Sequence, residues 1–417
     1  MTGGGAGRGH LSGAVTAAFA LALLLLTASC AGTFERPAPV DEGPMRARAV
    51  SRTEDGVRVA AAVPSASESR SIFGVDLEEH GIQPLWLEIE NGSRRNLYLL
   101  RTGLDPEYFA PREVAYLYKS SFNDQGEAAL GEHLEALSFD SRSPIRPGET
   151  VSGYVYVNRA DPTMMVDVDL IGREWSKRIG LVVPVLGTEA SRQRLAALAR
   201  LHEDAQIVDI GDEATLRTAL ENLPCCATSE TGNERLPLNL VLIGDLAEWG
   251  PAFRRRTYRY APVAPLYAFG RVQDLSGRKV SRWVPSQPQS VRVWLTPLRY
   301  QGAAVWVGQI STRLGGRFAP SEEDTRGIDP DVDAARNDVV QDLLYSQGVS
   351  KIGFVGGAGV ASGAEEAGGA EPRYRTDGLR AVLVFGGDAV SLADIDFFDW
   401  ERLVDHGWQK AGTPPMR

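Results

Sequence analysis

One apolar run near the start of the chain sets the conditions under which the rest must fold. Residues 11–26, LSGAVTAAFALALLLL, follow a short n-region that carries Arg8, an arrangement typical of a secretory signal. No later apolar run approaches the roughly 20 residues that a membrane-spanning helix requires. We therefore expect the remainder of the 417-residue chain to fold in water.

The signal ends in LTASC, where Ala28 and Ser29 directly precede Cys30. This ending resembles the lipobox of bacterial lipoproteins, whose cysteine receives a diacylglycerol and, after cleavage, an acyl chain such as palmitate on its new amine. Two or three chains hold a protein stably at a membrane. We expect Cys30 to anchor the chain to the cell envelope, facing the periplasm, and Ala31 slightly favours the outer membrane. A plain cleaved signal and a retained transmembrane anchor are the alternatives.

The overall charge argues against one class of partner. The formal net charge of −10 argues against nucleic acid as the main partner, because phosphate binding requires a basic surface. The acidic residues are spread along the chain, a pattern that favours solubility. The partners we expect are the membrane, through the lipid anchor, and an envelope protein or lipid.

Composition and turn signals divide the chain into six segments. We predict a signal peptide at 1–30, a disordered tether at 31–55, a β-sandwich at 56–186, a helical connector at 187–223, an α/β domain at 224–387 and a helical tail at 388–417.

The segment 56–186 shows mostly alternating strands separated by turn signals. Ser65 and Glu68 form a capping-box pattern that predicts a short helix. The dipeptide Asn91-Gly92 predicts a hairpin. Short antiparallel strands at this spacing predict an immunoglobulin-like sandwich.

The second half mixes helix and strand. Gln301-Gly302 predicts a hairpin between VRVWLTPLRY and AAVWVGQIST, and residues 329–347 predict a helix. The fold class we predict is therefore α+β and multidomain, with the sandwich followed by a mixed α/β domain.

Several ordered blocks of the second half resemble the LssY C-terminal domain family. They are APVAPLYAFGRVQDLSGRK, VRVWLTPLRYQGAAVWVGQIST, IDPDVDAARNDVVQDLL and YRTDGLRAVLVF. The resemblance extends from about residue 220 to 385 and implies a domain found in envelope lipoproteins and behind membrane-embedded phosphatase segments. The lysine-arginine and histidine motifs of those phosphatases, such as PSGH, do not occur here. Phosphatase activity is therefore not implied.

The stretch GIDPDVD holds Asp329, Asp331 and Asp333. We expect Asp329 to cap a helix that has Pro330 at its first position, because free amides and the helix dipole favour anions there. Asp331 and Asp333 would point in directions about 200° apart on a helix, which is poor geometry for one metal ion. A metal site and a catalytic or ligand-binding Asp329 are the alternatives.

Two polar loops are further candidates. Tyr267, Arg271 and Asp274 could line a polar pocket with Asp329, although Arg271 and Asp274 are more simply explained as partners of each other. The basic stretch RRRTYRY, 254–260, could meet lipid headgroups, phosphorylated sugars or a protein. We favour a solvated helix end.

The adjacent cysteines Cys225 and Cys226 leave three possibilities open. Buried thiols, a vicinal disulfide, and metal or redox use are all compatible with an oxidising compartment.

No complete catalytic constellation appears in the sequence, so the case leans against catalysis, and no cofactor is expected. We predict a membrane-anchored envelope lipoprotein that acts as a non-catalytic binding or structural module. The alternative is a hydrolase acting on an envelope lipid, glycan or phosphate-containing substrate through the polar loop of the LssY-like domain.

Overall fold

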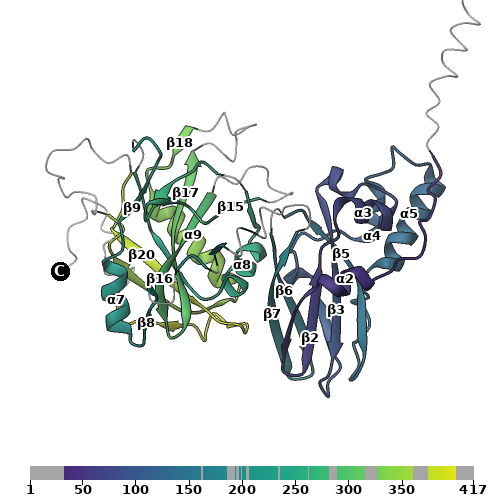
Figure 1. Cartoon of the computed structure of the whole chain (residues 1–417), viewed down its shortest axis with the longest axis horizontal. Helices are drawn as coiled ribbons and strands as arrows, with labels where there is room; N and C mark the ends of the chain where they lie inside the picture. The colour runs from purple at the N-terminus through teal and green to yellow at the C-terminus, as the bar shows by residue number, and fades with distance from the viewer. Residues whose placement is uncertain are drawn as a thin grey trace, which may run out of the picture.

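The computed structural model describes residues 32–400 except for 161–162, most of 186–205, and 233–234, 262, 281–288, 315–325 and 360–373. The described residues form two domains that lie side by side (Figure 1). No helix among them has both the length and the apolar character needed to cross a bilayer. The apolar run at 11–26 and Cys30 lie outside the described residues.

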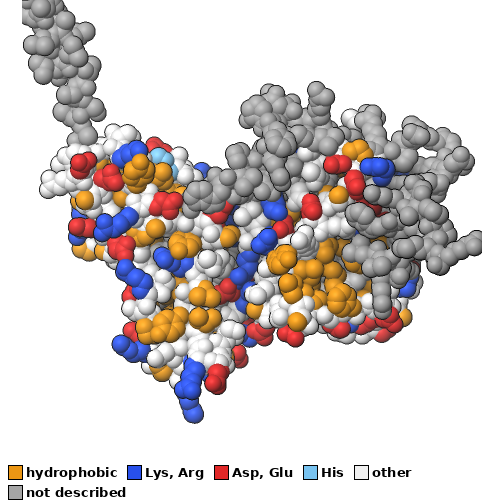
Figure 2. Space-filling view, turned by 180° about the vertical axis from the view of Figure 1, so that it is seen from behind, with side chains coloured by type: hydrophobic (Ala, Val, Ile, Leu, Met, Phe, Trp, Pro, Cys, Tyr) orange, Lys and Arg blue, Asp and Glu red, His pale blue; other side chains and the backbone are white. Residues whose placement is uncertain are grey.

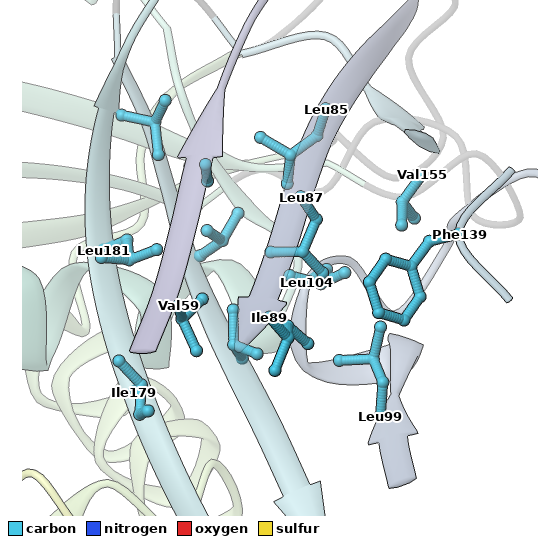
Figure 3. Packing of buried hydrophobic residues seen from close by; sticks show 14 of the residues in the cluster. Val59, Leu85, Leu87, Ile89, Leu99, Leu104, Phe139, Val155, Ile179 and Leu181 are labelled. Atoms are coloured by element: carbon cyan, nitrogen blue, oxygen red, sulfur yellow. The ribbon is translucent and has the colours of Figure 1, made fainter. Parts of the chain in front are cut away.

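The first domain is a sandwich of two antiparallel sheets, with strand orders β1-β2-β3-β5 and β4-β6-β7. Alternate residues of each strand, such as Val59 of β2, Leu87 of β3 and Leu181 of β7, point into one core between the sheets (Figure 3). The strands are β1 Val50–Glu54, β2 Val57–Ala62, β3 Ile82–Asn91, β4 Tyr98–Leu100, β5 Thr150–Asn158, β6 Thr163–Gly172 and β7 Trp175–Pro184.

The strand order is close to that of an immunoglobulin constant-type sandwich, but not identical to it. In that fold the larger sheet orders the first, second, fifth and fourth strands and faces the third, sixth and seventh. If β1 is set aside as an added edge strand, the other six follow this order without its fourth strand. The two-sheet sandwich is thus observed, and the immunoglobulin-like assignment stays a prediction.

Short helices cover the outer face of the larger sheet, where Trp86, Tyr154 and Tyr156 project into a second buried cluster. The predicted capping box is confirmed: the Ser65 hydroxyl accepts from the Glu68 amide at 3.3 Å, and the Glu68 carboxylate accepts from the Ser65 amide at 2.8 Å. The helices are α2 Gly43–Arg48, α3 Ala66–Phe73, α4 Pro111–Tyr116 and α5 Asp124–Leu137, with 3-10 turns η1 Leu77–His80 and η2 Arg101–Gly103.

The predicted hairpin at Asn91-Gly92 is wrong, because β3 and β4 belong to different sheets. Asn91 is fully buried. Its side-chain amide donates to the carbonyls of Arg95 at 2.7 Å and Ile145 at 2.8 Å. These bonds hold the turn by which the chain passes from one sheet to the other.

The predicted disordered tether at 31–55 is also wrong. Phe34 packs edge-on against Phe122, with ring centroids 5.7 Å apart. Met45 of α2 is 2% exposed, and β1 pairs with β2. A few apolar side chains therefore order a segment whose average composition resembles that of a disordered one.

The second domain is built on a ten-stranded sheet with the main order β12-β15-β16-β17-β11-β20-β19-β21, to which β8 and β18 are added. A smaller sheet has the order β10-β9-β13-β14. The predicted hairpin at Gln301-Gly302 joins β16 and β17, and both residues have positive φ (50° and 84°), as a type I′ turn requires.

The strands of this domain are β8 Val208–Ile210, β9 Cys226–Thr228, β10 Arg235–Pro237, β11 Leu240–Ile243, β12 Tyr258–Tyr260, β13 Tyr267–Ala268, β14 Arg271–Val272, β15 Leu275–Lys279, β16 Gln289–Tyr300, β17 Ala303–Leu314, β18 Arg326–Ile328, β19 Val349–Gly356, β20 Leu379–Phe385 and β21 Asp396–Phe397.

Both faces of the large sheet are covered. Helices α8 (Leu246–Arg255) and α9 (Val332–Tyr345) pack on one face, where Trp249 and Val339 meet Leu242 of β11. Helix α7 (Glu213–Glu221) and the smaller sheet cover the other face, where Leu216 meets Val241. The predicted mixed domain of helices and strands is thus observed.

The boundaries of this domain differ from the predicted segment 224–387. Helix α7 and strand β8, expected in the connector, belong to the domain, because β8 pairs with β16. The predicted helical tail is wrong in its described part: residues 388–400 contain no helix, and β21 pairs with β19. Residues 401–417 lie outside the described part of the chain.

The basic stretch 254–260 joins the two domains. Arg254 is 5% exposed and also donates to the carbonyl of Leu104 at 3.1 Å. The ion pairs that this stretch makes with the first domain include Arg254–Asp105 (3.1 Å), Arg259–Glu107 (2.9 Å), Arg255–Asp167 (2.6 Å) and Arg255–Asp169. The predicted solvated helix end is therefore wrong for these arginines, because carboxylates of the first domain take the place of water.

Charged side chains of both signs lie on the face of the molecule shown in Figure 2. On the face shown in Figure 2, acidic and basic side chains are interspersed over both domains, and hydrophobic side chains gather on the second domain. The net charge of −10 is therefore not collected in a single patch on this face.

Candidate functional site

The carboxylates of Asp329 and Asp331, just before α9, accept hydrogen bonds from nearby backbone amides. Asp331, not Asp329, is the N-cap of the helix, and its carboxylate accepts from the Ala334 amide at 3.0 Å. The Asp329 carboxylate accepts from the Asp331 amide at 3.0 Å, which forms a local turn before the helix. The helix cap was therefore predicted correctly in kind but two residues too early.

Asp333 has a different set of partners. Its carboxylate accepts from the Thr376 hydroxyl at 2.9 Å and from the Asp377 amide at 2.6 Å. Burial raises the pKa of Asp333, and the charge of Arg336 acts in the opposite direction. The three aspartates thus bind three different parts of the backbone. Within the described residues no group of three or more His, Cys, Asp or Glu side chains is placed to hold a metal ion.

Arg271 and Asp274 form a two-bond pair, with distances of 3.1 and 2.8 Å. Asp274 also accepts from the Leu295 amide at 2.7 Å, so the pair fixes the loop to β16. Tyr267 lies in β13, which pairs with β14 and β9. No contact among the described residues joins this group to Asp329, so the predicted shared pocket is not observed.

A pocket of about 330 Å³ lies elsewhere, against the face of the large sheet that the smaller sheet covers. Its floor comes from two neighbouring strands, which contribute Ser290 and Arg292 of β16 and Ser311 and Arg313 of β17. Its walls are residues 229–231, between β9 and β10, together with Leu236, residues 264–266 and Ile328. The sequence analysis did not identify these residues as a site.

Arg292 is the most constrained polar group of this pocket. It is 5% exposed, and its guanidinium donates to the Ala264 carbonyl at 3.0 Å and to the Gln309 side-chain oxygen at 2.7 Å. Ser290 lies 3.5 Å from the same guanidinium. Gln309 is fully buried, and its side-chain nitrogen has no partner among the described residues. The Ala264 carbonyl and the Gln309 side chain therefore fix the orientation of the Arg292 guanidinium.

Two further arginines lie near Arg292, at positions 278 and 313 of neighbouring strands. Arg278 of β15 lies opposite Ser290 in the strand register. Burial lowers the pKa of Arg278, and the positive charge of Arg313 lowers it further.

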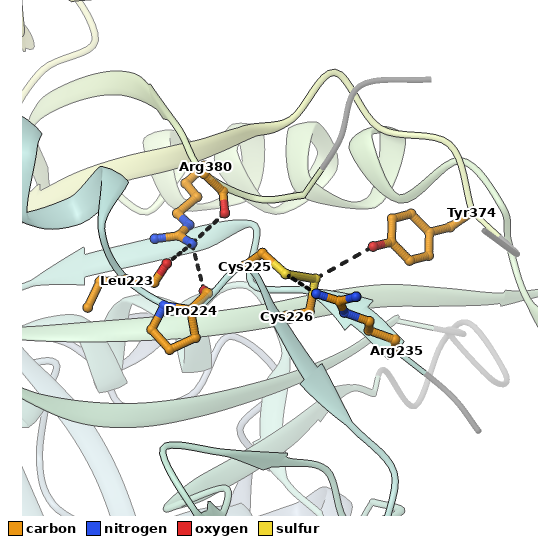
Figure 4. The surroundings of a disulfide bond; sticks show 8 residues. Leu223, Pro224, Cys225, Cys226, Arg235, Tyr374 and Arg380 are labelled. Carbon is orange, nitrogen blue, oxygen red and sulfur yellow. Dashed lines mark hydrogen bonds between the residues drawn. A yellow bond between two sulfur atoms is a disulfide. The ribbon is translucent and has the colours of Figure 1, made fainter. Parts of the chain in front are cut away.

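Cys225 and Cys226 form a vicinal disulfide (Figure 4). Of the three possibilities that the sequence left open, the structure therefore has the bonded one. Both cysteines are half-buried, and Cys226 begins β9, which leads directly into the turn that walls the pocket.

Comparison with known proteins identifies the second domain. No curated protein and no solved structure matches the chain. One family model, described as the LssY C-terminus, matches residues 245–379. This range contains α8, the floor of the pocket and α9. The second domain of this chain thus contains a region, residues 245–379, that matches the LssY C-terminus.

Proposed function

We propose that this protein is a lipid-anchored protein of the bacterial cell envelope whose second domain binds, without catalysis, a small molecule that carries an oxyanion group. The observation that carries the proposal is the buried, oriented Arg292 in a pocket within the LssY C-terminal domain.

The size and lining of the pocket favour a small ligand. A volume of about 330 Å³ is near the lower end of the range for small-molecule sites. The serines and Thr231 offer hydroxyl groups, while Leu236, Pro265 and Ile328 offer an apolar wall. A polar group attached to a short carbon skeleton fits this combination.

The chemistry of the floor favours an anion. A guanidinium presents a planar set of donors that matches a carboxylate or a phosphate. Arg292 is already held in place by Ala264 and Gln309, so little side-chain entropy remains to be lost on binding. The Gln309 side-chain nitrogen has no partner among the described residues and lies in the same buried network, so a ligand or an ordered water could complete its hydrogen bonding.

The anchor is inferred from the sequence LTASC alone. A lipid on Cys30 would lie roughly 7 Å of extended chain from Gly32, and the Gly32 amide donates to the Ser121 carbonyl at 3.1 Å. A lipidated protein would therefore hold the α4–α5 end of the sandwich against the bilayer. The outer membrane remains the slightly favoured location.

The anchor is tested by Cys30→Ser. We expect the parent to pellet with membranes and to incorporate a clickable palmitate analogue, and the variant to lose both properties. A parent that pellets without incorporating label would contradict lipidation.

The binding proposal is tested by melting temperatures in phosphate, sulfate and glycerol 3-phosphate, with glycerol as the neutral control. A ligand that binds only the folded state raises the melting temperature. We expect a rise with the anions in the parent and none in Arg292→Gln. If Arg292→Gln does not fold, Arg313→Gln, at the other floor strand, provides the comparison. Equal effects of glycerol and glycerol 3-phosphate would contradict the proposal.

A further inference from the structure

The vicinal disulfide lies beside a positive charge that faces solvent. Arg235, exposed at the start of β10, donates to the Cys225 sulfur at 2.9 Å. The Cys226 sulfur lies 3.7 Å from the Tyr374 hydroxyl. The two sulfurs therefore have different neighbours, a guanidinium for one and a phenol for the other (Figure 4).

A second guanidinium holds the backbone that precedes the cysteines. Arg380 is fully buried in β20, and it donates to carbonyl oxygens of Leu220 (2.5 Å), Leu223 (3.1 Å), Pro224 (2.7 Å) and Gly357 (2.6 Å). Burial lowers the pKa of Arg380 to about 10, so the group stays positive at neutral pH. No carboxylate among the described residues contacts it. The segment that carries the disulfide thus sits on an uncompensated buried cation.

We propose that Cys225–Cys226 is a site of thiol–disulfide exchange with a dithiol, in which Cys225 is the sulfur released as a thiolate. The dithiol's thiolate attacks the Cys226 sulfur, a mixed disulfide forms there, and the Cys225–Cys226 bond breaks with its electron pair on Cys225. The second thiolate of the dithiol then attacks its own sulfur in the mixed disulfide and releases Cys226. The dithiol is oxidised to a disulfide, and the protein gains two electrons and two protons.

The direction of this exchange follows from the neighbours of each sulfur. A thiol beside an arginine has a lower pKa, and the sulfur with the lower pKa leaves faster. Arg235 contacts Cys225 and not Cys226. Attack on Cys226 therefore places the developing charge where a guanidinium is already in contact. This inference does not depend on a ligand in the Arg292 pocket.

The first test uses the full-length chain with Cys30→Ser, which leaves Cys225 and Cys226 as its only cysteines. The oxidised protein is equilibrated with reduced and oxidised dithiothreitol, quenched with an alkylating reagent and weighed by mass spectrometry. We expect reversible reduction while the protein stays folded, as monitored by circular dichroism. A bond that resists millimolar dithiothreitol until the chain unfolds would overturn the proposal.

The second test identifies the released sulfur. In the same background, Arg235→Met removes the charge and Arg235→Lys retains it. We expect Arg235→Met to slow reduction by roughly threefold and Arg235→Lys to change it less. Cys226→Ser and Cys225→Ser each leave one thiol, whose pKa is read from the pH dependence of iodoacetamide alkylation. The Cys225 thiol should have the lower pKa. The opposite order, or an unchanged rate in Arg235→Met, would contradict the assignment.

Discussion

The second domain buries arginines in two different settings. At the joint between the domains, Arg254 and Arg255 contact carboxylates of the sandwich. In the pocket, the contacts of Arg292 with Ala264, Ser290 and Gln309 are all with uncharged oxygens. The same side-chain type thus serves two purposes. Carboxylates of the sandwich pair with the arginines of the joint, whereas the oxygens of Ala264 and Gln309 fix the direction of Arg292 inside the pocket.

This difference separates a structural role from a binding role. An arginine paired with a buried carboxylate cannot be removed without leaving an unpaired charge. An arginine held in one direction inside a pocket presents a planar set of donors to a ligand anion. Substitution at the joint should therefore act on stability, and substitution in the pocket should act mainly on binding.

The largest loss of stability is expected at the joint, the ion-paired contact of residues 254–260 with the first domain. Arg254→Met removes the nearer of the two arginines beside the buried Asp105, at 3.1 Å, and leaves Arg259 at 3.9 Å. We expect a loss of about 3–5 kcal/mol in the free energy of unfolding. The double variant Arg254→Met with Asp105→Asn should recover part of this loss, because the buried carboxylate that has lost its nearer cation is replaced by a neutral amide. Urea denaturation measures both. Equal losses in the single and double variants would show that Arg254 acts by packing alone.

The joint should also be sensitive to acid. Burial alone would raise the pKa of Asp105, but the charges of Arg254 and Arg259 outweigh it and hold this pKa below its usual range. A lowered folded-state pKa stabilises the fold at pH values above the unfolded-state value of about 3.9, and the stabilisation is lost as the pH falls through the folded-state pKa. In melts from pH 7 to pH 2, the parent should lose more stability below pH 4 than the double variant does.

A smaller loss of stability is expected where the backbone of β7 in the first domain closely approaches that of α8 in the second domain. A Cβ atom at Gly180 of β7 would overlap the carbonyl oxygen of Ala247 in α8, whereas one at Gly211 would meet nothing within 4 Å. We expect Gly180→Ala to cost roughly 1–3 kcal/mol and Gly211→Ala to stay within about 0.5 kcal/mol of the parent. Equal free energies of unfolding for the two variants would mean that the two domains can shift relative to each other and so accommodate the added methyl group.

The smallest change in the free energy of unfolding is expected at Asp331, whose carboxylate caps only its own helix. Asp331→Ala removes the cap of α9 and should cost about 1 kcal/mol, while Asp331→Asn should retain most of the stability. Thermal melts in chelator and in added calcium, magnesium or zinc check both variants. A metal that raises the melting temperature of the parent but not of Asp331→Asn would favour a metal site instead.

Local signals predicted local structure well. The Ser65–Glu68 box, the Gln301-Gly302 turn and the helix of α9 depend on residues close in sequence, and all are observed. The hairpin at Asn91 failed because its side chain is bound by Ile145, 54 residues away. The sequence around 254–260 gives no sign of burial, because the carboxylate partners of Arg254, Arg255 and Arg259 lie in the other domain.

The pocket was missed for a related reason. Residues 290–293, Ser-Val-Arg-Val, alternate as a strand, so that Val291 and Val293 enter one core and Arg292 faces the opposite side of the sheet. A charged residue within an otherwise apolar strand was an available signal. However, only the fold shows that Arg313 of the next strand and the turn at 229–231 surround the same space.

The most direct test of the binding role is calorimetric titration with glycerol 3-phosphate and with glycerol, which differ only in the phosphate. We predict that the parent binds glycerol 3-phosphate and not glycerol, that Arg292→Gln weakens binding at least tenfold, and that Arg259→Gln at the joint leaves the affinity unchanged in protein shown to be folded. A tenfold change corresponds to about 1.4 kcal/mol. Equal affinity in the parent and Arg292→Gln, or binding of glycerol as tight as that of its phosphate, would contradict the assignment of Arg292 to an anion site.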